Sequence, residues 1–290
     1  MKNLDLSTLP AKKRKQIVSC LRAGIQLLYF LFLPSVFTAA FNGVKYIFTQ
    51  LGQGEKIEMT AFVSALLLVC AFTIVFGRFF CGFACAFGSL GDAMHAIYGI
   101  ICKKRKKKPR RIKPETAKKL ALIKYGILLL IALCCFAGVY QKARGTSPWD
   151  VFSMLHAGNF RLSSYVPGIV LLLLILVGMF FEERFFCRFL CPMGAVFSLL
   201  PVLPFFTLHR KRENCIRGCS ACTRQCPSAV ELPSDGSMEI SGDCFQCQKC
   251  IDTCPKGNIR CGVKELHGNE ILFTLFRAVF LLTLLLWAGI

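Results

Sequence analysis

Long apolar stretches alternate with polar segments along this chain. Five of the stretches are close to the 17–25 residues that a helix needs to cross the hydrocarbon core of a bilayer. They cover residues 17–38, 60–77, 120–140, 166–181 and 271–290. The pattern predicts five membrane-spanning helices and leaves one long polar insertion between the fourth and the fifth. We therefore expect an all-α polytopic membrane bundle that carries a separate module in this insertion.

The composition supports this prediction and indicates an orientation. Hydrophobic residues make up 54% of the 290 residues, and 36 Lys and Arg against 16 Asp and Glu give a net charge of +20. Five crossings put 28 Lys and Arg on one side, in 1–16, 78–119 and 182–270, and 5 on the other side, in 39–59 and 141–166. Without the long insertion the difference is still 17 against 5. Because positively charged loops stay in the cytoplasm, we expect a cytoplasmic N-terminus, a cytoplasmic basic linker at 103–119 and no nucleic-acid partner.

One motif occurs twice. Residues 78–88 have the sequence RFFCGFACAFG and residues 184–194 have RFFCRFLCPMG, with seven of eleven positions identical at a constant offset of 106. Each copy follows an even-numbered predicted span. We therefore predict two parallel two-helix repeats, over 17–102 and 120–206, that are related by an axis along the membrane normal. The span at 271–290 is then a fifth helix added to the pair.

Each copy of the motif contains a C-x3-C pair, Cys81 with Cys85 and Cys187 with Cys191. A spacing of four residues puts both sulfurs on one side of a helix. In paired repeats the two cysteine pairs face each other near the inner membrane surface. Four convergent thiolates can hold an iron–sulfur cluster or another soft metal, so we expect a third redox or metal centre here. The alternative is that these cysteines are small hydrophobic residues in a Phe-rich packing motif.

The polar insertion contains two runs of four cysteines, each ending in Cys-Pro. The first run is Cys215, Cys219, Cys222 and Cys226, and the second is Cys244, Cys247, Cys250 and Cys254. The second run has the spacing of bacterial ferredoxins, in which the fourth cysteine ligates the other cluster. We therefore expect two [4Fe–4S] clusters in an α+β ferredoxin-like module over 207–264. One cluster takes Cys215, Cys219, Cys222 and Cys254, and the other takes Cys244, Cys247, Cys250 and Cys226. Structural zinc sites use paired knuckles instead.

Paired C-x3-C motifs after apolar spans, followed by a two-cluster ferredoxin segment, resemble the NapH/NosR-type membrane iron–sulfur proteins. They are also similar to the CcoG-type proteins of cytochrome oxidase assembly. The resemblance covers about residues 60–262 and departs from the family pattern at Ala86, where the family has Pro. It implies electron exchange between quinol or a cytoplasmic donor and an extracytoplasmic acceptor. NosR-type proteins carry an FMN domain, and we expect any flavin used here to come from a separate partner.

These observations predict an iron–sulfur electron-transfer protein of the cell membrane, as a quinol-dehydrogenase-type subunit of an oxidoreductase system. The expected partners are a ferredoxin-like or flavodoxin-like cytoplasmic donor, or the quinone pool, and an extracytoplasmic acceptor. Two alternatives stay open. A CcoG-like copper reductase or assembly factor would handle copper at the C-x3-C pairs, and a redox sensor would use its clusters without turnover. A transporter is not expected, because the spans have almost no polar residues at their centres.

Other ionisable residues have simpler predicted roles. None of the histidines lies inside a predicted span, which argues against haem in the bundle; they are His95, His156, His209 and His267. Arg22, Lys124 and Arg277 lie near inner ends of spans, and we expect them to extend their charges to the interface. Glu182 and Glu183 end the fourth span, and we expect them to face water. A proton relay at a quinol site is the alternative for this pair.

Overall fold

The computed structural model describes residues 11–107, 109, 111–140, 145–160, 163–262 and 270–289, and most of these residues are helical. Residues 1–10 of the predicted basic N-terminus, 263–264 of the predicted module and His267 lie outside this part of the chain. The helices are α1 (Ala11–Phe32), α2 (Val36–Gln53), α3 (Ala61–Phe76), α4 (Ala86–Lys104), α5 (Pro114–Leu120), α6 (Ile123–Phe136), α7 (Pro148–His156), α8 (Val166–Phe181), α9 (Pro192–Leu199), α10 (Ala221–Gln225), α11 (Lys249–Thr253) and α12 (Glu270–Trp287). The strands are β1 (Leu208–Lys211), β2 (Asp235–Met238) and β3 (Ile259–Cys261).

The prediction of a single helix over 17–38 is wrong. α1 ends at Phe32, α2 begins at Val36, and the two helices meet at an angle of 61°. Pro34 lies in the break. Proline has no N–H to donate and disfavours the α conformation of the residue before it. α2 then fills most of the segment that we predicted as the first outer loop.

Two helical stretches are long and apolar enough to cross a bilayer. They are Glu115–Phe136, which joins α5 and α6, and Ser163–Phe181, which contains α8. The bent pair α1–α2 makes a third if its two halves form one span. α3 and residues Ile271–Trp287 of α12 are apolar but shorter. The described residues thus provide two or three candidate spans, where the hydropathy pattern alone predicts five.

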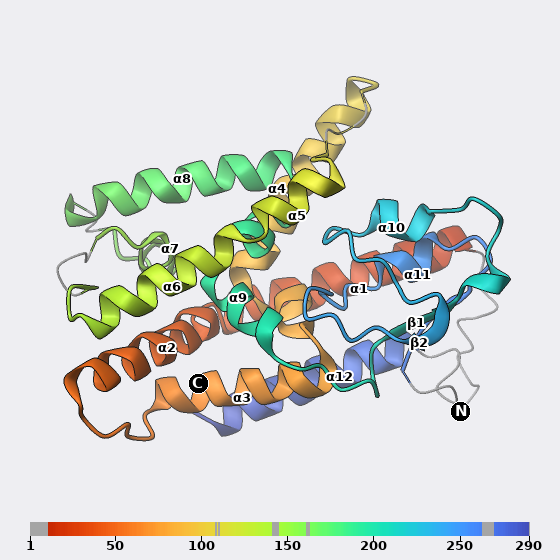
Figure 1. Ribbon diagram of the computed structural model, residues 1–290. Coiled ribbons are helices and arrows are strands. Elements are labelled where there is room, and N and C mark those ends of the chain that lie inside the picture. The colour runs from red at the N-terminus through yellow and green to blue at the C-terminus, as the bar shows by residue number, and fades with distance from the viewer. Residues whose placement is uncertain are drawn as a thin grey trace.

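The long helices lie side by side, and the cysteine-rich module lies at one end of them, beside α1 (Figure 1). α2 packs against α3 and α6, α4 packs against α8, and α12 packs against α3. Their shared core is rich in phenylalanine and extends to the C-x3-C cysteines. One continuous core therefore extends from the packed helices to the C-x3-C cysteines, next to the module.

The two copies of the repeated motif have the same local structure. Each contains a one-turn π-helix, at Phe80–Ala84 in the first copy and at Phe186–Leu190 in the second. The second cysteine of each pair is extended, with φ −69° and ψ 117° at Cys85 and φ −73° and ψ 115° at Cys191. Cys85 is the N-cap residue of the following helix, α4, and Cys191 is the N-cap residue of α9. Because π-helical turns occur often at functional sites, the repeated distortion indicates a shared role for the two motifs.

The insertion forms a small α+β unit, as its cysteine pattern predicts. Its strands make an antiparallel sheet in the order β2–β1–β3, in which Leu208 pairs with Cys261 and His209 pairs with Met238. α10 and α11 pack against each other, and α11 also contacts β3. The unit has an apolar core of its own, made by Leu208, Cys222, Leu232, Cys244, Ile251, Ile259 and Cys261.

Candidate iron–sulfur site

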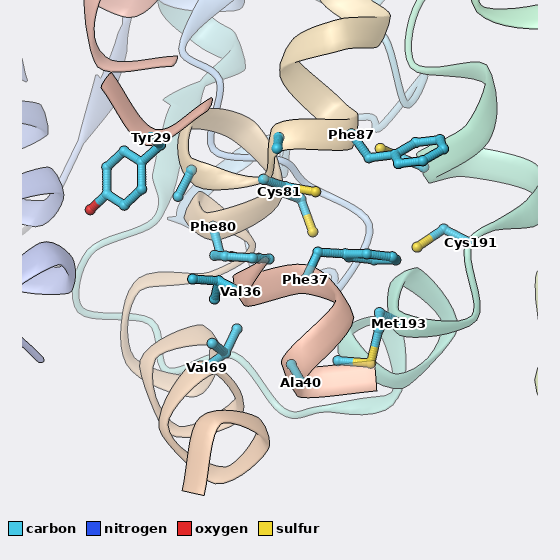
Figure 2. Close-up of a cluster of buried hydrophobic side chains, with 14 of the residues drawn as sticks. Tyr29, Val36, Phe37, Ala40, Val69, Phe80, Cys81, Phe87, Cys191 and Met193 are labelled. Atoms are coloured by element: carbon cyan, nitrogen blue, oxygen red, sulfur yellow. The ribbon is translucent and has the colours of Figure 1, made fainter. Parts of the chain in front are cut away.

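The fold brings the two C-x3-C pairs to one place. Cys81, Cys85, Cys187 and Cys191 are all buried, and all belong to the same group of core residues. Phe37, which α2 supplies, belongs to the same core and is drawn with Cys81 and Cys191 in Figure 2. The four thiols are therefore part of a core that is rich in phenylalanine.

The chemistry of these thiols depends on whether a cation is bound. Burial and the neighbouring thiols raise the pKa of Cys85 and of Cys191 well above the ordinary range. Burial, with a contribution from Cys81, raises the pKa of Cys187 to about 11. At neutral pH the thiols of Cys85, Cys187 and Cys191 therefore keep their protons in the absence of a metal and lose them when a metal binds. The N–H of Gly194 donates to Cys191 Sγ at 3.1 Å, a contact that also suits a thiolate ligand.

Two buried arginines join the repeats reciprocally. Arg78, from the first copy of the motif, donates through Nη2 to the carbonyl of Gly194 in the second copy at 3.0 Å. Arg184, from the second copy, donates to the carbonyls of Cys81 and, at 2.9 Å, Gly82 in the first copy. Position 78 and position 184 are equivalent in the repeat. Each motif is thus held in shape by the arginine of the other.

Glycine is required where these arginines pass. A Cβ atom at Gly88 would lie 2.7 Å from Arg184 Nη1, and a Cβ atom at Gly194 would lie 2.9 Å from Arg78 Nη2. These distances are too short for a side-chain carbon, so any larger residue would displace the guanidinium. Gly88 and Gly194 are equivalent in the repeat as well. This explains why both copies of the motif end in glycine.

Arg184 is neutralised by a carboxylate. Its Nε donates to Asp92 Oδ1 at 2.8 Å, and Gln26 donates to Asp92 Oδ2 at 2.8 Å. Burial alone would raise the pKa of Asp92, but Arg184, with Arg22 and Lys249 nearby, holds that pKa well below its ordinary value. The pair is therefore ionised at neutral pH.

The second predicted cluster-binding set surrounds one pocket in the module. Its members Cys226, Cys244, Cys247 and Cys250 all line this pocket, together with Cys222 and apolar side chains such as Leu208, Val230 and Leu232. Burial and the neighbouring thiols raise the pKa of Cys250 and hold the pKa of Cys226 at about 11. The four thiols are thus near enough to affect one another, although Cys226 comes from the other run.

The first predicted set is joined by Asn258. Its side-chain amide donates to Cys215 Sγ at 3.3 Å, and its backbone N–H donates to Cys254 Sγ at 3.3 Å. Cys215 and Cys254 come from different runs, so this contact brings together the two thiols that the crossed pattern assigns to one cluster. Cys222 accepts from Arg210 Nη1 at 3.2 Å. Cys219 is half-buried in the same loop and makes no hydrogen bond to the other three thiols within the described residues.

The loop of the second run has an unusual backbone. Gln246 and Gln248, on either side of Cys247, have φ values of +51° and +59°. Residues with side chains rarely adopt this left-handed conformation, and it is concentrated at functional sites. The side chain of Gln248 accepts from Thr274 Oγ1 at 3.1 Å, which fixes the loop against α12. The strained turns let three closely spaced cysteines face one space.

A cluster fits these sets better than a single ion does. Within the described residues, no three His, Cys, Asp or Glu side chains converge on the position of one metal ion. A [4Fe–4S] cluster instead takes four thiolates at its separate corners. The ligands therefore surround a space, as Cys226, Cys244, Cys247 and Cys250 do around their pocket. Eight of the predicted cysteines could hold two clusters in the module, and Cys81, Cys85, Cys187 and Cys191 could hold a third centre.

Phe245 connects the module to the repeats. This residue lies between Cys244 and Cys247, and its ring centroid is 4.9 Å from the guanidinium carbon of Arg78 and 5.6 Å from that of Arg184. A Cβ atom at Gly82 would lie only 2.4 Å from the carbonyl oxygen of Phe245. The second-run loop is therefore seated directly on the first C-x3-C motif, between the two reciprocal arginines.

Asp243 fastens the same loop to the helices. Its Oδ1 accepts from Lys124 Nζ at 2.7 Å, from Ser198 Oγ at 2.9 Å and from Arg78 Nη1 at 3.3 Å. Burial would raise the pKa of Asp243, but Lys124 and Arg78 lower it below its ordinary value. Lys124 is buried, so the prediction that it extends to the membrane interface is wrong. Its charge is instead used to dock the module.

Two further predictions about charged residues are also corrected. Glu182 and Glu183 are buried rather than facing water, because Glu182 pairs with Arg188 at 2.8 Å and Glu183 pairs with Lys249. Glu183 thereby ties the end of α8 to α11 of the module. Arg277 is fully buried and does not extend to the interface. Arg22 is half-buried over the ring of Phe83.

Sequence reasoning identified the cysteines but missed the residues that position them. Arg78 and Arg184 were visible as the first residue of each repeated motif, and their identity in both copies was the available clue. Lys124 and Arg277 were visible as charges within apolar stretches. Phe245, Asp243 and Asn258 had no comparable clue, because their contacts join segments far apart in the sequence.

Comparison with known proteins places the chain among iron–sulfur proteins. A family model described as "4Fe-4S binding domain" matches residues 59–109 and 166–211, and each matched stretch contains one C-x3-C pair. The chain is 30% identical over 207 residues to the uncharacterized protein MJ0749 of Methanocaldococcus jannaschii, covering 70% of this chain and 71% of that protein. It is 27% identical over 244 residues to MJ0750 of the same organism, covering 83% and 93%.

A relative with a functional name is the ferredoxin-type protein NapH of Haemophilus influenzae. The chain is 24% identical to it over 217 residues, which cover 72% of this chain and 70% of that protein. No solved structure matches the chain. The comparisons therefore support an iron–sulfur protein of the electron-transfer type.

Proposed function

Because this chain belongs to the NapH/NosR-type family of 4Fe–4S ferredoxin-domain electron-transfer proteins, we propose that it conducts electrons between two clusters in its module and a third centre at the C-x3-C pairs. From that centre the electrons would pass to an acceptor on the other side of the membrane. An iron–sulfur electron-transfer function follows from the family itself. The third centre and the path across the membrane are the specific content of the proposal.

The position of Phe245 carries the proposal. Phe245 belongs to the loop that presents Cys244 and Cys247, and its ring lies over Arg78 and Arg184, which grip the C-x3-C motifs. Arg184 also interacts electrostatically with both Cys187 and Cys247. One side chain thus lies between the second-run thiols and the C-x3-C thiols. A packing motif without redox function would not need the module seated on it in this way.

The chain supplies ligands, insulation and charge. Clusters bound at these thiols would take up and release single electrons, at potentials set by the hydrogen bonds and charges around the sulfurs. Asn258 and Arg210 donate to thiols of the first-run set, and Gly194 donates to Cys191. The Phe-rich core keeps water away from the C-x3-C thiols. Arg78 and Arg184 fix the two motifs at a constant separation.

Membrane insertion and orientation complete the proposal. The candidate spans would cross the bilayer, and the module would lie in the cytoplasm. The excess of Lys and Arg in the short loops of one side, 17 against 5, supports this orientation. A ferredoxin-like or flavodoxin-like protein, or the quinone pool, would then exchange electrons on the cytoplasmic side. An extracytoplasmic redox partner would exchange them on the other side.

The contact of Phe245 with Arg78 and Arg184 favours this function over copper handling. A sensor without turnover would not need thiols in the middle of the helical core. Neither alternative accounts for the placement of Phe245.

Electron transfer through vesicles tests the proposal. The protein is reconstituted into vesicles that contain trapped ferricyanide, and dithionite is added outside. We expect ferricyanide to be reduced at a rate well above that of protein-free vesicles. The double variant Cys81→Ser/Cys187→Ser should lose this rate, whereas Cys134→Ser, a cysteine of an apolar helix outside both motifs, should retain it. Equal rates for the two variants would contradict the third centre.

A further inference from the structure

Arg277 is a buried cation without a partner of opposite charge. Its side chain is fully buried in α12. The guanidinium carbon lies 4.6 Å from the ring centroid of Phe79 and 4.4 Å from that of Phe273, so the charge is held between two aromatic faces. Its hydrogen-bond partner is the thiol of Cys261, and no carboxylate is among the groups that act on its charge. Burying a charge in this state costs several kcal/mol unless something compensates it.

Four other buried bases near the module are paired with carboxylates, whereas Arg210 donates to Cys222 Sγ and to the carbonyl of Leu232. Arg78 and Lys124 share Asp243, Arg184 pairs with Asp92, and Arg188 pairs with Glu182. Arg277 instead interacts with thiols, first with Cys261, to which it is also hydrogen-bonded, and then with Cys244. Cys244 belongs to the set Cys226, Cys244, Cys247 and Cys250. The unbalanced charge therefore faces a group of potential thiolates.

An independent contact places the same face of α12 against that set. Thr274, three residues before Arg277, donates through Oγ1 to Gln248 Oε1 at 3.1 Å. Gln248 lies in the loop between Cys247 and Cys250 and lines the pocket that these cysteines surround. Residues three apart lie on one face of a helix, so Arg277 follows Thr274 on the side that meets the module.

We propose that Arg277 is a positioning residue for the cluster at Cys226, Cys244, Cys247 and Cys250, and that its charge raises the reduction potential of this cluster. The inference rests on the proposed function. A [4Fe–4S] cluster with four thiolates is an anion, and it gains one further negative charge when it accepts one electron. No bond is made or broken, and no proton moves, because arginine stays charged. A fixed positive charge in a low-dielectric core stabilises the reduced form more than the oxidised form.

This role explains why the position holds arginine in an apolar helix. A hydrophobic side chain of similar volume would pack there without the cost of burying a charge. The aromatic faces of Phe79 and Phe273 offset part of that cost in the absence of a carboxylate. A carboxylate partner would cancel the charge, and its absence leaves the field of Arg277 for the cluster. The electron is then held on the cluster that lies beside Phe245 and the C-x3-C pairs.

A redox titration followed by electron paramagnetic resonance tests the proposal on the full chain in detergent. Arg277→Met keeps the volume and removes the charge, and Arg277→Lys keeps the charge. We expect Arg277→Met to lower the midpoint potential of one module cluster and to leave the other unchanged, with a smaller shift in Arg277→Lys. Arg22→Met is the matched control, because Arg22 also lies over a ring, at 5.5 Å from that of Phe83, but has Asp92 nearby.

The outcomes separate the two proposals. Wild-type protein that binds no module clusters would overturn the proposed function, whereas bound clusters with unchanged potentials in Arg277→Met would overturn the role of Arg277 alone. Equal shifts of both clusters would also overturn it. If Arg277→Met loses its iron, retention of iron in Arg277→Lys supports the charge role. Equal loss of iron in both variants would show that Arg277 serves only for packing and would contradict the proposal.

Discussion

Arg78 and Arg184 occupy equivalent positions 106 residues apart, and each donates to a backbone carbonyl in the other copy of the motif. The exchange joins two loops that are distant in sequence and fixes all four C-x3-C cysteines relative to one another. Both guanidinium groups also lie over the same aromatic ring, that of Phe245. The junction between the repeats is therefore also the junction with the ferredoxin-like module.

Removing Arg184 should destabilise the junction. Arg184→Gln leaves Asp92 buried without its main partner, and breaking a buried ion pair in this way costs about 3–5 kcal/mol. We expect a clearly lower thermal midpoint in detergent than for Arg105→Gln, which removes an exposed arginine at the end of α4. The double variant Arg184→Gln/Asp92→Asn should recover part of the loss. Equal midpoints for Arg184→Gln and Arg105→Gln would show that the pair is not structural.

The same pair predicts a dependence on pH. The folded pKa of Asp92 lies below its ordinary value of 3.8, so its ionised form is favoured by folding. The stability that it contributes is complete above the unfolded pKa and is lost as the pH falls through the folded pKa. We expect the difference in thermal midpoint between wild type and Asp92→Asn to stay constant between about pH 5 and 8, because this range lies above the unfolded pKa. Below about pH 4 the advantage of wild type over Asp92→Asn should shrink, and a constant difference would contradict the assignment.

A methyl group at position 82 should separate the module from the repeats. In Gly82→Ala the new Cβ would meet the carbonyl oxygen of Phe245 at 2.4 Å, and backbone cannot yield as a flexible side chain can. We expect slower transfer through vesicles while the module keeps its own iron. Gly99→Ala is the matched control, since nothing lies within 4 Å of a Cβ there. If both variants transfer electrons at the wild-type rate, the docked loop is not part of the path.

Asn258 should tune the cluster of the first run. Its amide donates to Cys215 Sγ, and hydrogen bonds to cluster sulfurs are among the features that set the reduction potential. Asn258→Ala removes this bond but keeps the backbone N–H that donates to Cys254. We expect a lower potential for one cluster only, and it should be the cluster that Arg277→Met leaves unchanged. Asn42→Ala, in α2, should move neither potential; a shift of the same cluster by both Asn258→Ala and Arg277→Met would contradict the crossed ligand sets.

The sequence was most informative where structure is local. Cysteine runs with fixed spacing predict a ferredoxin-like unit because closely spaced ligands can wrap one cluster, and the small sheet and two short helices agree with that prediction. The duplicated motif predicts equivalent backbone turns, and both copies contain the same π-helix and the same extended cysteine. These features depend on residues a few positions apart.

Long-range relationships could not be obtained from the same patterns. Hydropathy alone passes over Pro34, since one proline barely changes the apolar character of the stretch that it breaks. A charge near the end of an apolar span is compatible both with extension to the interface and with a buried partner. The apolar pattern predicts that Lys124 extends to the interface, whereas its buried partner, Asp243, is 119 residues away in the sequence. Nothing near Lys124 in the sequence distinguishes the two.

Iron and acid-labile sulfide per chain, measured on protein purified anaerobically from membranes, test the central claim most directly. Two [4Fe–4S] clusters account for about eight of each. The account predicts about ten to twelve in wild type, falling to about eight in Cys81→Ser/Cys187→Ser, while Cys134→Ser keeps the wild-type value. About eight in wild type and in every variant would contradict a third centre, and the C-x3-C cysteines would then be packing residues.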